Sequence, residues 1–229
     1  MNIAIILPPQ AKTLDKLPAT IRVMKRQRSS RSTPRGASAS RGTSRPPGKL
    51  RIIGGDYRRR LLPVLDQPGL RPTPDRVRET LFNWLGQALY GQRVLDLFAG
   101  TGALGIEALS RGAAAVTFVE RTPAVASLIG NNLATLGTLK GHVVTQEAQA
   151  FLAQPGDPMA LVFLDPPFHQ GLAAPCCAQL EAGGWLADDA MIYLETEHTL
   201  TPEVPANWQL HRETRAGESV ARLYRRGPA

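Results

Sequence analysis

Hydrophobic and polar positions follow two periods along most of this chain. From residue 93 onward, short apolar runs alternate with longer stretches in which apolar positions recur every three or four residues. The short runs predict buried strands and the longer stretches predict helices. The predicted strands are residues 93–98, 115–120, 142–145, 161–165 and 190–195, and the predicted helices are residues 103–111, 123–136, 148–153 and 172–182. Strands that alternate with helices predict a parallel, doubly wound α/β sheet.

Two further pairs of short runs flank this region. Residues 49–53 and 60–64 predict a small N-terminal β-hairpin with a glycine-containing turn. Residues 208–214 and 219–224 predict a closing antiparallel hairpin that adds edge strands. The fold expected is therefore a seven-stranded, mostly parallel, Rossmann-like sheet with a C-terminal antiparallel hairpin and a small N-terminal extension.

A helix is predicted between the N-terminal hairpin and the first parallel strand. Thr73 can cap it, Pro74 suits its first turn, and Asp75 suits the positive end of its dipole. The positions expected to face the core recur at helical spacing. They are Val77, Leu81, Trp84, Leu85 and Ala88.

The first 48 residues differ from the rest. Residues 25–48 are rich in Ser, Arg, Pro and Gly and lack a hydrophobic period, which predicts disorder. We expect an arm at residues 1–48 and one domain at residues 49–229, in which residues 49–92 form the hairpin and helix and residues 93–229 the main sheet. Met24 opens a plausible shorter product, so the true start is either Met1 or Met24.

Composition excludes several classes of protein. Of the 229 residues, 43% are hydrophobic, which excludes a wholly disordered chain. No apolar run approaches the roughly 18 residues of a membrane span. Cys176 and Cys177 are the only cysteines and are adjacent, so a secreted disulfide scaffold is excluded and a cytoplasmic location is expected. The four histidines lack metal-ligand spacing, so no metal is expected, and the absence of a dimer stripe predicts a monomer.

Charge is unevenly distributed. The chain carries a net charge of +8, but residues 1–60 hold fifteen Lys or Arg and only two Asp or Glu. A basic arm on a mildly acidic body predicts a polyanionic partner, most often a nucleic acid. The alternative is an arm that only confers solubility.

A glycine-rich loop follows the first parallel strand. Residues 100–105, GTGALG, match G-x-G-x-x-G between a strand and a helix, which indicates a nucleoside-type cofactor. Glu120 ends the next strand, where it can accept hydrogen bonds from ribose hydroxyls. The loop alone leaves NAD(P) and S-adenosylmethionine open. Asp96 favours the latter, because a carboxylate below the loop suits a cation and repels a diphosphate.

A second motif, Asp165-Pro166-Pro167-Phe168, follows the fourth parallel strand. Two prolines remove two N–H donors, which leaves the Asp165 carboxylate and the Pro166 carbonyl as acceptors beside an aromatic ring. Such a site suits a planar amine on a base, with Phe168 stacking on that base. Two acceptors can orient the amine so that its lone pair points at an activated methyl group. The alternative is a Pro-Pro turn in which Asp165 caps the next helix.

Together these motifs resemble the class I S-adenosylmethionine-dependent aminomethyltransferases. Longer blocks are similar to one bacterial family, the RsmD-type 16S rRNA guanine-N2 methyltransferases, and the similarity runs from about residue 49 to residue 225. These blocks are RIIGG at residues 51–55, LRPTPDRVRETLFNWL at residues 70–85 and GWL at residues 184–186.

The resemblance implies a substrate and a set of site residues. The substrate is the exocyclic amine of guanine 966 of 16S rRNA in the 30S subunit, with the base flipped into the residue 165–168 turn. Residues implied to bind S-adenosylmethionine are Asp96, Phe98, Ala99, Gly100, Thr101, Gly102, Glu120, Glu147 and Ala148. Glu147 departs from the family pattern, which commonly has Asp or Asn there, so its contact with adenine is the least secure of these.

Arginines near the predicted mouth of the site are expected to bind RNA phosphates. They are Arg58, Arg71, Arg76 and Arg78, and their alternative role is a solvated surface or, for Arg78, an ion pair with Glu79. Three other functions stay open on the short motifs alone: amine methylation of DNA adenine or protein glutamine, a dehydrogenase, and a non-catalytic RNA-binding assembly factor.

Overall fold

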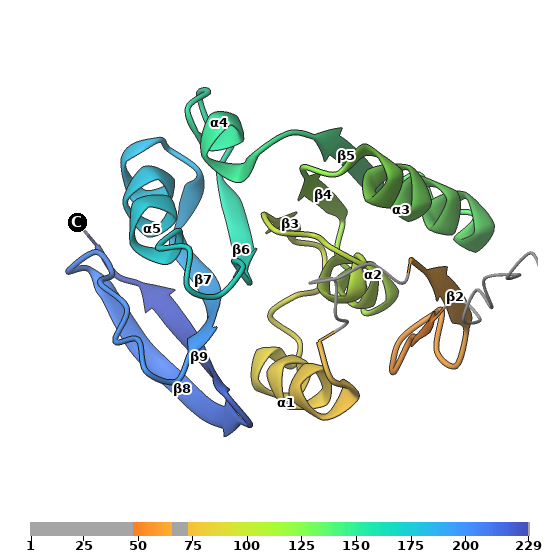
Figure 1. Ribbon diagram of the computed structural model, residues 1–229, viewed down its shortest axis with the longest axis horizontal. Helices are drawn as coiled ribbons and strands as arrows, with labels where there is room; N and C mark the ends of the chain where they lie inside the picture. Colours follow the sequence, from red (N-terminus) through yellow and green to blue (C-terminus); the bar gives the residue numbers. More distant parts are fainter. Residues whose placement is uncertain (1–47, 66–72, 229) are drawn as a thin grey trace, which may run out of the picture. The chain divides into compact units, whose positions relative to one another are not determined.

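The computed structural model describes residues 48–65 and 73–228, which form a seven-stranded sheet, a two-stranded hairpin and five helices (Figure 1). The strand order in the large sheet is β5-β4-β3-β6-β7-β9-β8. Its strands are β3 (Arg93–Asp96), β4 (Ala115–Glu120), β5 (Gly141–Thr145), β6 (Met159–Leu164), β7 (Leu186–Glu197), β8 (Trp208–Ala216) and β9 (Ser219–Arg226). The first five pair in parallel, and β9 and β8 continue the sheet antiparallel. The predicted fold class is therefore confirmed.

The C-terminal hairpin differs from the prediction in one respect. Strand β9 pairs with β7 from Met191↔Arg225 to Glu197↔Ser219 and with β8 on its other side, so of the two hairpin strands only β8 lies at an edge of the sheet. An ion pair holds this hairpin to the body: Arg226 donates two-pronged hydrogen bonds of 2.8–3.1 Å to Glu181. These bonds are the main reason that the pKa of Glu181 falls to about 2.

Helices cover both faces of the sheet, as a doubly wound arrangement requires. They are α1 (Asp75–Leu85), α2 (Ala103–Ser110), α3 (Pro123–Leu136), α4 (Ala148–Leu152) and α5 (Ala173–Ala182). Side chains of alternate strand residues point to opposite faces of the sheet and belong to two separate hydrophobic cores. Helices α1, α2 and α3 pack on one face, and α4 and α5 pack on the other (Figure 1). Cys176 and Cys177 are fully buried in the second core, where burial raises the thiol pKa values to about 11 and about 12.

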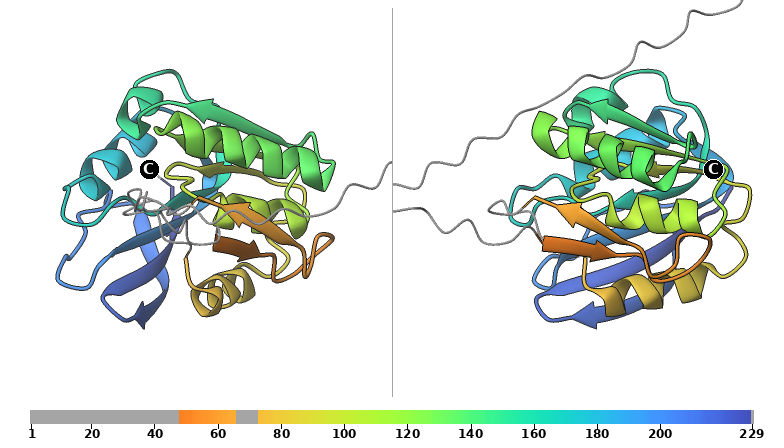
Figure 2. Two further views of the ribbon diagram at one scale, coloured as in Figure 1. Left: turned by 45° about the vertical axis from the view of Figure 1, so that its right-hand side comes forward. Right: turned by 90° about the vertical axis from the view of Figure 1, so that its right-hand side faces the viewer.

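The N-terminal hairpin consists of β1 (Gly48–Arg51) and β2 (Leu61–Val64), paired antiparallel as predicted. Both further views show it beside α2 (Figure 2). The turn is held by Glu107 of α2, whose fully buried carboxylate accepts the Ile53 and Gly54 N–H groups at 2.8 Å. A Cβ on Gly55, which has φ +72°, would lie 1.7 Å from the Ser110 carbonyl oxygen. The hairpin can therefore approach α2 this closely only because residue 55 is glycine.

Helix α1 begins and ends differently from the prediction. Pro74 occupies the N-cap position, and Thr73 makes no side-chain cap bond, so the expected Thr73 cap is wrong. The helix ends at Leu85, before Gly86, which leaves Ala88 exposed beyond it. Phe82 is buried instead, with its ring 6.0 Å edge-on from that of Phe163. Val77, Leu81 and Leu85 are buried as expected, and Trp84 is half-buried.

Most other boundaries agree with the prediction within two residues. Strand β7 is longer, because it includes four residues before the predicted start and two after the predicted end. No helix in the described part of the chain is both long and apolar enough to span a membrane. The predicted disorder of residues 25–48 lies outside the described residues, except for Gly48, which begins β1.

Candidate functional site

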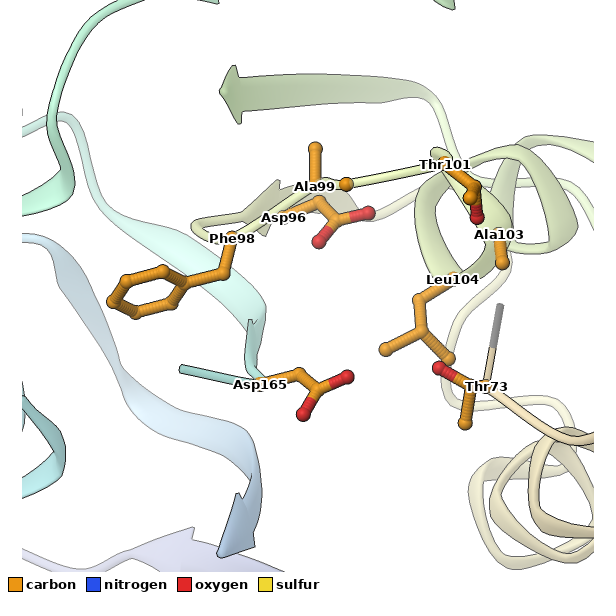
Figure 3. A pocket seen from close by; sticks show the side chains of 9 residues that line it. Thr73, Asp96, Phe98, Ala99, Thr101, Ala103, Leu104 and Asp165 are labelled. Atoms are coloured by element: carbon orange, nitrogen blue, oxygen red, sulfur yellow. The ribbon is translucent and has the colours of Figure 1, made fainter. Parts of the chain in front are cut away.

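The carboxyl ends of β3 and β6 meet at a cavity of about 290 Å³, a volume that includes space open to solvent. Ligands of open α/β sheets bind at this edge. Asp96 and Asp165 both point into the cavity, while Leu104 and Thr73 form its opposite side (Figure 3). Its lining residues are Thr73, Asp96, Phe98, Ala99, Gly100, Thr101, Ala103, Leu104 and Asp165.

Asp96 is the last residue of β3, and its side chain is almost completely buried. One carboxylate oxygen, Oδ2, accepts the Gly105 N–H of α2 at 2.9 Å. Burial raises the pKa of Asp96 to about 7, the Gly105 bond opposes this, and the charge of Glu120 adds to it. No cation is paired with Asp96 among the ion pairs of the described residues, so the site favours a positively charged ligand group.

The glycine loop turns the chain sharply from β3 into α2. Gly100 and Gly102 have φ values of +50° and +76°, which glycine adopts without steric cost. The Gly102 N–H closes the turn on the Ala99 carbonyl at 2.6 Å. A Cβ on Gly102 would lie 3.1 Å from Ile106 Cδ1, so the packing against α2 is tight there. The loop consequently presents backbone to the cavity with few side chains in the way.

Glu120 connects the loop to the next strand. Its Oε2 accepts the Gly100 N–H at 3.0 Å, and its Oε1 accepts the Thr122 N–H at 2.7 Å. The side chain is half-buried and does not line the cavity. Each carboxylate oxygen has two lone pairs, so both oxygens can also accept a ligand hydroxyl.

Asp165 lies directly after β6, with Pro166 buried, Pro167 exposed and Phe168 half-buried. Desolvation raises the pKa of Asp165 well above its usual range, and the charges of Glu195 and Asp96 raise it further. Glu195 is held by Tyr193, whose hydroxyl donates to Glu195 Oε2 at 2.7 Å within β7. In its ionised form, a carboxylate with a raised pKa binds a proton more tightly than an ordinary aspartate does.

The cavity brings together only some of the predicted site residues. Asp96, Asp165 and the loop from Phe98 to Thr101 line it, although the ring of Phe98 points away (Figure 3). Glu147, Ala148, Gly102 and residues 166–168 do not line it. Glu147 is exposed at the N-cap of α4, with its Oε1 3.8 Å from Arg121 Nη1.

Sequence reasoning assigned no site role to three lining residues. Ala103 and Leu104 lie within the glycine motif itself, where the glycines carry the recognisable pattern. Thr73 comes from the start of α1, 92 residues from Asp165, and only the long block at residues 70–85 could have indicated it.

The arginines expected to bind RNA separate into two kinds. Arg58 and Arg76 are exposed, and Arg71 lies outside the described residues. Arg78 is 1% exposed and donates hydrogen bonds to the Thr73 and Arg51 carbonyls and to Asp75. Its burial contradicts the expected role in RNA binding. Arg78 links α1 to the hairpin instead, and its acidic partner there is Asp75 rather than Glu79.

The donors present fit a cationic nucleoside cofactor and a flat amine. Loop backbone, the buried Asp96 carboxylate and the half-buried Glu120 carboxylate suit the cofactor, and the turn at residues 165–168 contains oxygen atoms that could accept hydrogen bonds from the amine. Within residues 48–65 and 73–228, no group of three His, Cys, Asp or Glu side chains could hold a metal ion.

Comparison with known proteins gives concordant matches. A family described as "Conserved hypothetical protein 95" matches residues 50–225. "Ribosomal RNA small subunit methyltransferase D" of Escherichia coli K12 is 55% identical over 180 residues, covering 78% of this chain and 91% of that protein. The Haemophilus influenzae protein of the same name is 46% identical over 186 residues, covering 80% of this chain and 96% of that protein.

Solved structures of proteins assigned as methyltransferases are also similar to this chain. YhhF of Escherichia coli, assigned as a methyltransferase, has a TM-score of 0.76 at 51% identity, covering 80% of this chain and all of that one. A protein assigned as a methyltransferase and complexed with SAH has a TM-score of 0.54 at 15% identity, covering 69% of this chain and 50% of that one. The latter likeness concerns the fold alone.

Proposed function

The chain belongs to the ribosomal RNA small subunit methyltransferase D family, and we propose that residues 165–168 hold the guanine that it methylates. The enzyme transfers a methyl group from S-adenosylmethionine to the exocyclic N2 amine of a guanine in 16S rRNA. One observation carries the assignment of the site: two acids from neighbouring strands, the buried Asp96 and the half-buried Asp165, share one cavity beside the glycine loop.

Asp96 and the loop are proposed to hold the cofactor. S-adenosylmethionine, when bound, supplies a methyl group activated by a positively charged sulfur. The loop backbone at residues 99–101 borders the cavity and leaves room for a ligand, and the uncompensated Asp96 carboxylate favours its cationic methionine end. Glu120 is proposed to accept the ribose hydroxyls, and Glu147 and Ala148 to lie near the adenine.

Asp165 and Pro166 are proposed to orient the guanine amine. Their carboxylate and carbonyl oxygens can each accept one N2–H, which aims the nitrogen lone pair at the methyl carbon. The new N–C bond forms as the C–S bond breaks, and one N2 proton must then leave. The raised pKa of Asp165 allows its carboxylate oxygen to hold that proton. Phe168 is proposed to stack on the flipped base.

The RNA is proposed to approach across the N-terminal hairpin and α1. Arg58 and Arg76 are exposed there, and Arg59 and Arg60 add two further exposed cations to the same hairpin. Such side chains neutralise phosphates without reading the sequence. We propose that the substrate is guanine 966 in the small subunit, that the enzyme acts in the cytoplasm, and that it acts as a monomer.

Labelled S-adenosylmethionine and 30S particles that lack the modification test this function. After incubation with the purified protein, the rRNA is digested and its nucleosides are separated. Label in N2-methylguanosine at position 966 is the expected result. Label in another nucleoside or another position would refute the proposed base, and label in protein or DNA would refute the substrate class.

A further inference from the structure

The residue directly after the guanine-binding turn has an unusual backbone. His169 has φ +60°, and it is one of two non-glycine residues with positive φ in the described part of the chain. A side chain with a Cβ is disfavoured in this left-handed region, and such residues persist where their surroundings hold them. The left-handed backbone conformation of His169 is therefore expected to depend on a specific contact with its surroundings.

Glu197, the last residue of β7, provides that contact. Its Oε1 lies 3.3 Å from the His169 backbone nitrogen, which donates to it, and 3.3 Å from the ring Nδ1 of the same residue. Glu197 is fixed in turn, because it ends a strand and pairs with Ser219 of β9. One carboxylate oxygen thus connects the turn at His169 to the end of β7, where Glu197 lies 28 residues later in the sequence.

The tie reaches the residue proposed to stack on the base. The Phe168 and His169 rings are 6.4 Å apart in an edge-to-face arrangement. The His169 side chain is 77% exposed and that of Glu197 only 15% exposed. The imidazole ring therefore lies at the surface, and the carboxylate that contacts it is largely buried. An exposed contact of this kind adds little to the stability of the whole fold. We therefore expect it to affect the conformation of the turn rather than the free energy of unfolding.

We propose that Glu197 and His169 are positioning residues that fix the turn at residues 165–168 for the incoming guanine. This inference rests on the function proposed above for that turn. Without the Glu197 carboxylate, His169 is no longer held in its left-handed conformation, and the Phe168 ring and the Pro166 carbonyl lose their fixed direction. The guanine amine is then misaligned even when RNA and cofactor are fully bound.

Three single variants, the double variant Glu197→Ala/His169→Gly and one control test this proposal. Glu197→Ala removes the acceptor, Glu197→Gln keeps an oxygen acceptor for the backbone N–H, and His169→Gly supplies a residue that tolerates φ +60° unaided. Glu203→Ala, at an exposed carboxylate between β7 and β8, is the matched control. Rates with saturating 30S particles and amide hydrogen exchange of residues 168–171 are measured for each.

We expect Glu197→Ala to lower kcat about three- to tenfold at unchanged cofactor affinity, to speed exchange of the His169 amide, and to be largely rescued in Glu197→Gln. In the His169→Gly background, Glu197→Ala should change kcat less than twofold, because the carboxylate then has no strained residue to hold. A Glu197→Ala variant with wild-type kcat and wild-type exchange would overturn the inference, and so would additive effects in the double variant.

Hydrogen exchange separates this inference from the proposed function. Faster exchange of the turn in Glu197→Ala supports the tie even if the wild-type protein methylates no rRNA, and that inactivity would count against the proposed function alone. If the wild-type enzyme is active and Glu197→Ala changes neither the amide exchange of the turn nor kcat, the positioning role alone is refuted.

Discussion

At the scale of single residues, the site concentrates negative charge where the fold would otherwise avoid it. Asp96 and Asp165 lie 69 positions apart in the sequence and line one cavity, and the charge of Asp96 contributes to the raised pKa of Asp165. Buried acids without a paired cation reduce the stability of the ligand-free protein. Proteins retain such groups at sites where a ligand supplies the missing charge or where an acid must take up a proton.

The pKa of Asp96 gives a testable pH dependence of stability. Its pKa is about 7 in the folded protein, against 3.8 for a free aspartate side chain, so its contribution to stability is fully present below about pH 4. That contribution is lost as the pH rises towards 7, because the unfolded chain releases the proton first. The loss amounts to at most about 4 kcal/mol at 1.36 kcal/mol for each pKa unit.

We therefore expect Asp96→Asn to flatten the stability profile between pH 4 and pH 7. Urea unfolding of the ligand-free wild type and variant at several pH values in this range measures the difference. Most other titrating groups are common to both proteins and largely cancel. Asp165 adds to the flattening, because its pKa falls when the Asp96 charge is removed. Parallel profiles for the two proteins would show that Asp96 does not titrate in this range.

Asp165 is expected to matter for catalysis far more than for binding. Asp165→Ala removes the acceptor that we propose for the guanine amine and should lower the single-turnover rate about 100- to 1,000-fold. Binding of 30S particles should survive, because phosphate contacts by distant arginines supply most of that affinity.

Asp157→Ala is the matched control, since this 75% exposed carboxylate precedes β6 at the opposite end of the same strand. It should leave the rate unchanged. If Asp165→Ala retained the wild-type rate, residues 165–168 would not be the guanine site.

At the scale of elements, one buried carboxylate joins three of them. Glu107 of α2 accepts the Ile53 and Gly54 N–H groups of the hairpin turn and the Arg111 Nε at 2.7 Å, and Arg78 Nη1 of α1 lies 3.7 Å away. Arg78 in turn bonds the carbonyl of Thr73, which lines the cavity. Hairpin, α1 and α2 are thereby held in one arrangement around the site.

Replacing this carboxylate should strongly destabilise the protein. Glu107→Ala removes the acceptor of the Ile53 and Gly54 N–H groups and the carboxylate that lies 3.7 Å from the buried Arg78 Nη1, which leaves Asp75 as the acidic partner of Arg78. It is expected to lower the free energy of unfolding by about 3–5 kcal/mol. Glu213→Ala breaks an ion pair with Arg222 in which the glutamate is 48% exposed, and should cost less than about 1 kcal/mol. Urea unfolding of both variants makes the comparison, and similar losses would contradict the account of the network.

The limits of sequence reasoning are clearest at this scale. Strands β3 to β6 and the helices between them were predictable because their burial follows a regular period, and Asp96 and Asp165 because strand ends meet at one edge. Arg78 was misassigned because an arginine is usually exposed, and nothing local reveals that it also contacts the Arg51 carbonyl of the hairpin and lies 3.7 Å from Glu107, 29 residues later. The tie between His169 and Glu197 is invisible for the same reason: it depends on which side chains the finished sheet brings together.

At the scale of the whole molecule, charge separates the chain into a basic N-terminal part and an acidic remainder. Residues 1–47 hold ten Lys or Arg and one Asp, whereas residues 61–229 hold twelve Lys or Arg and seventeen Asp or Glu. The net negative charge of residues 61–229 would repel RNA. Exposed cations such as Arg58 and Arg76 must therefore attract phosphates over a short range, where their own charge outweighs this repulsion. The basic segment offers a larger attraction that needs no defined geometry.

Deleting residues 1–47 should therefore weaken binding of 30S particles most at low salt. Each phosphate that the segment neutralises contributes about 0.7 to 0.9 to the slope of log affinity against log salt, so the truncated protein should show a shallower slope and the two affinities should converge as salt rises. Cofactor affinity should stay unchanged, because the cavity residues from Thr73 to Asp165 are all retained. A full-length variant with these ten Lys and Arg replaced by Gln separates charge from chain length: it should behave like the truncation. An unchanged slope in both variants would instead assign the segment to solubility, as its composition alone also allows.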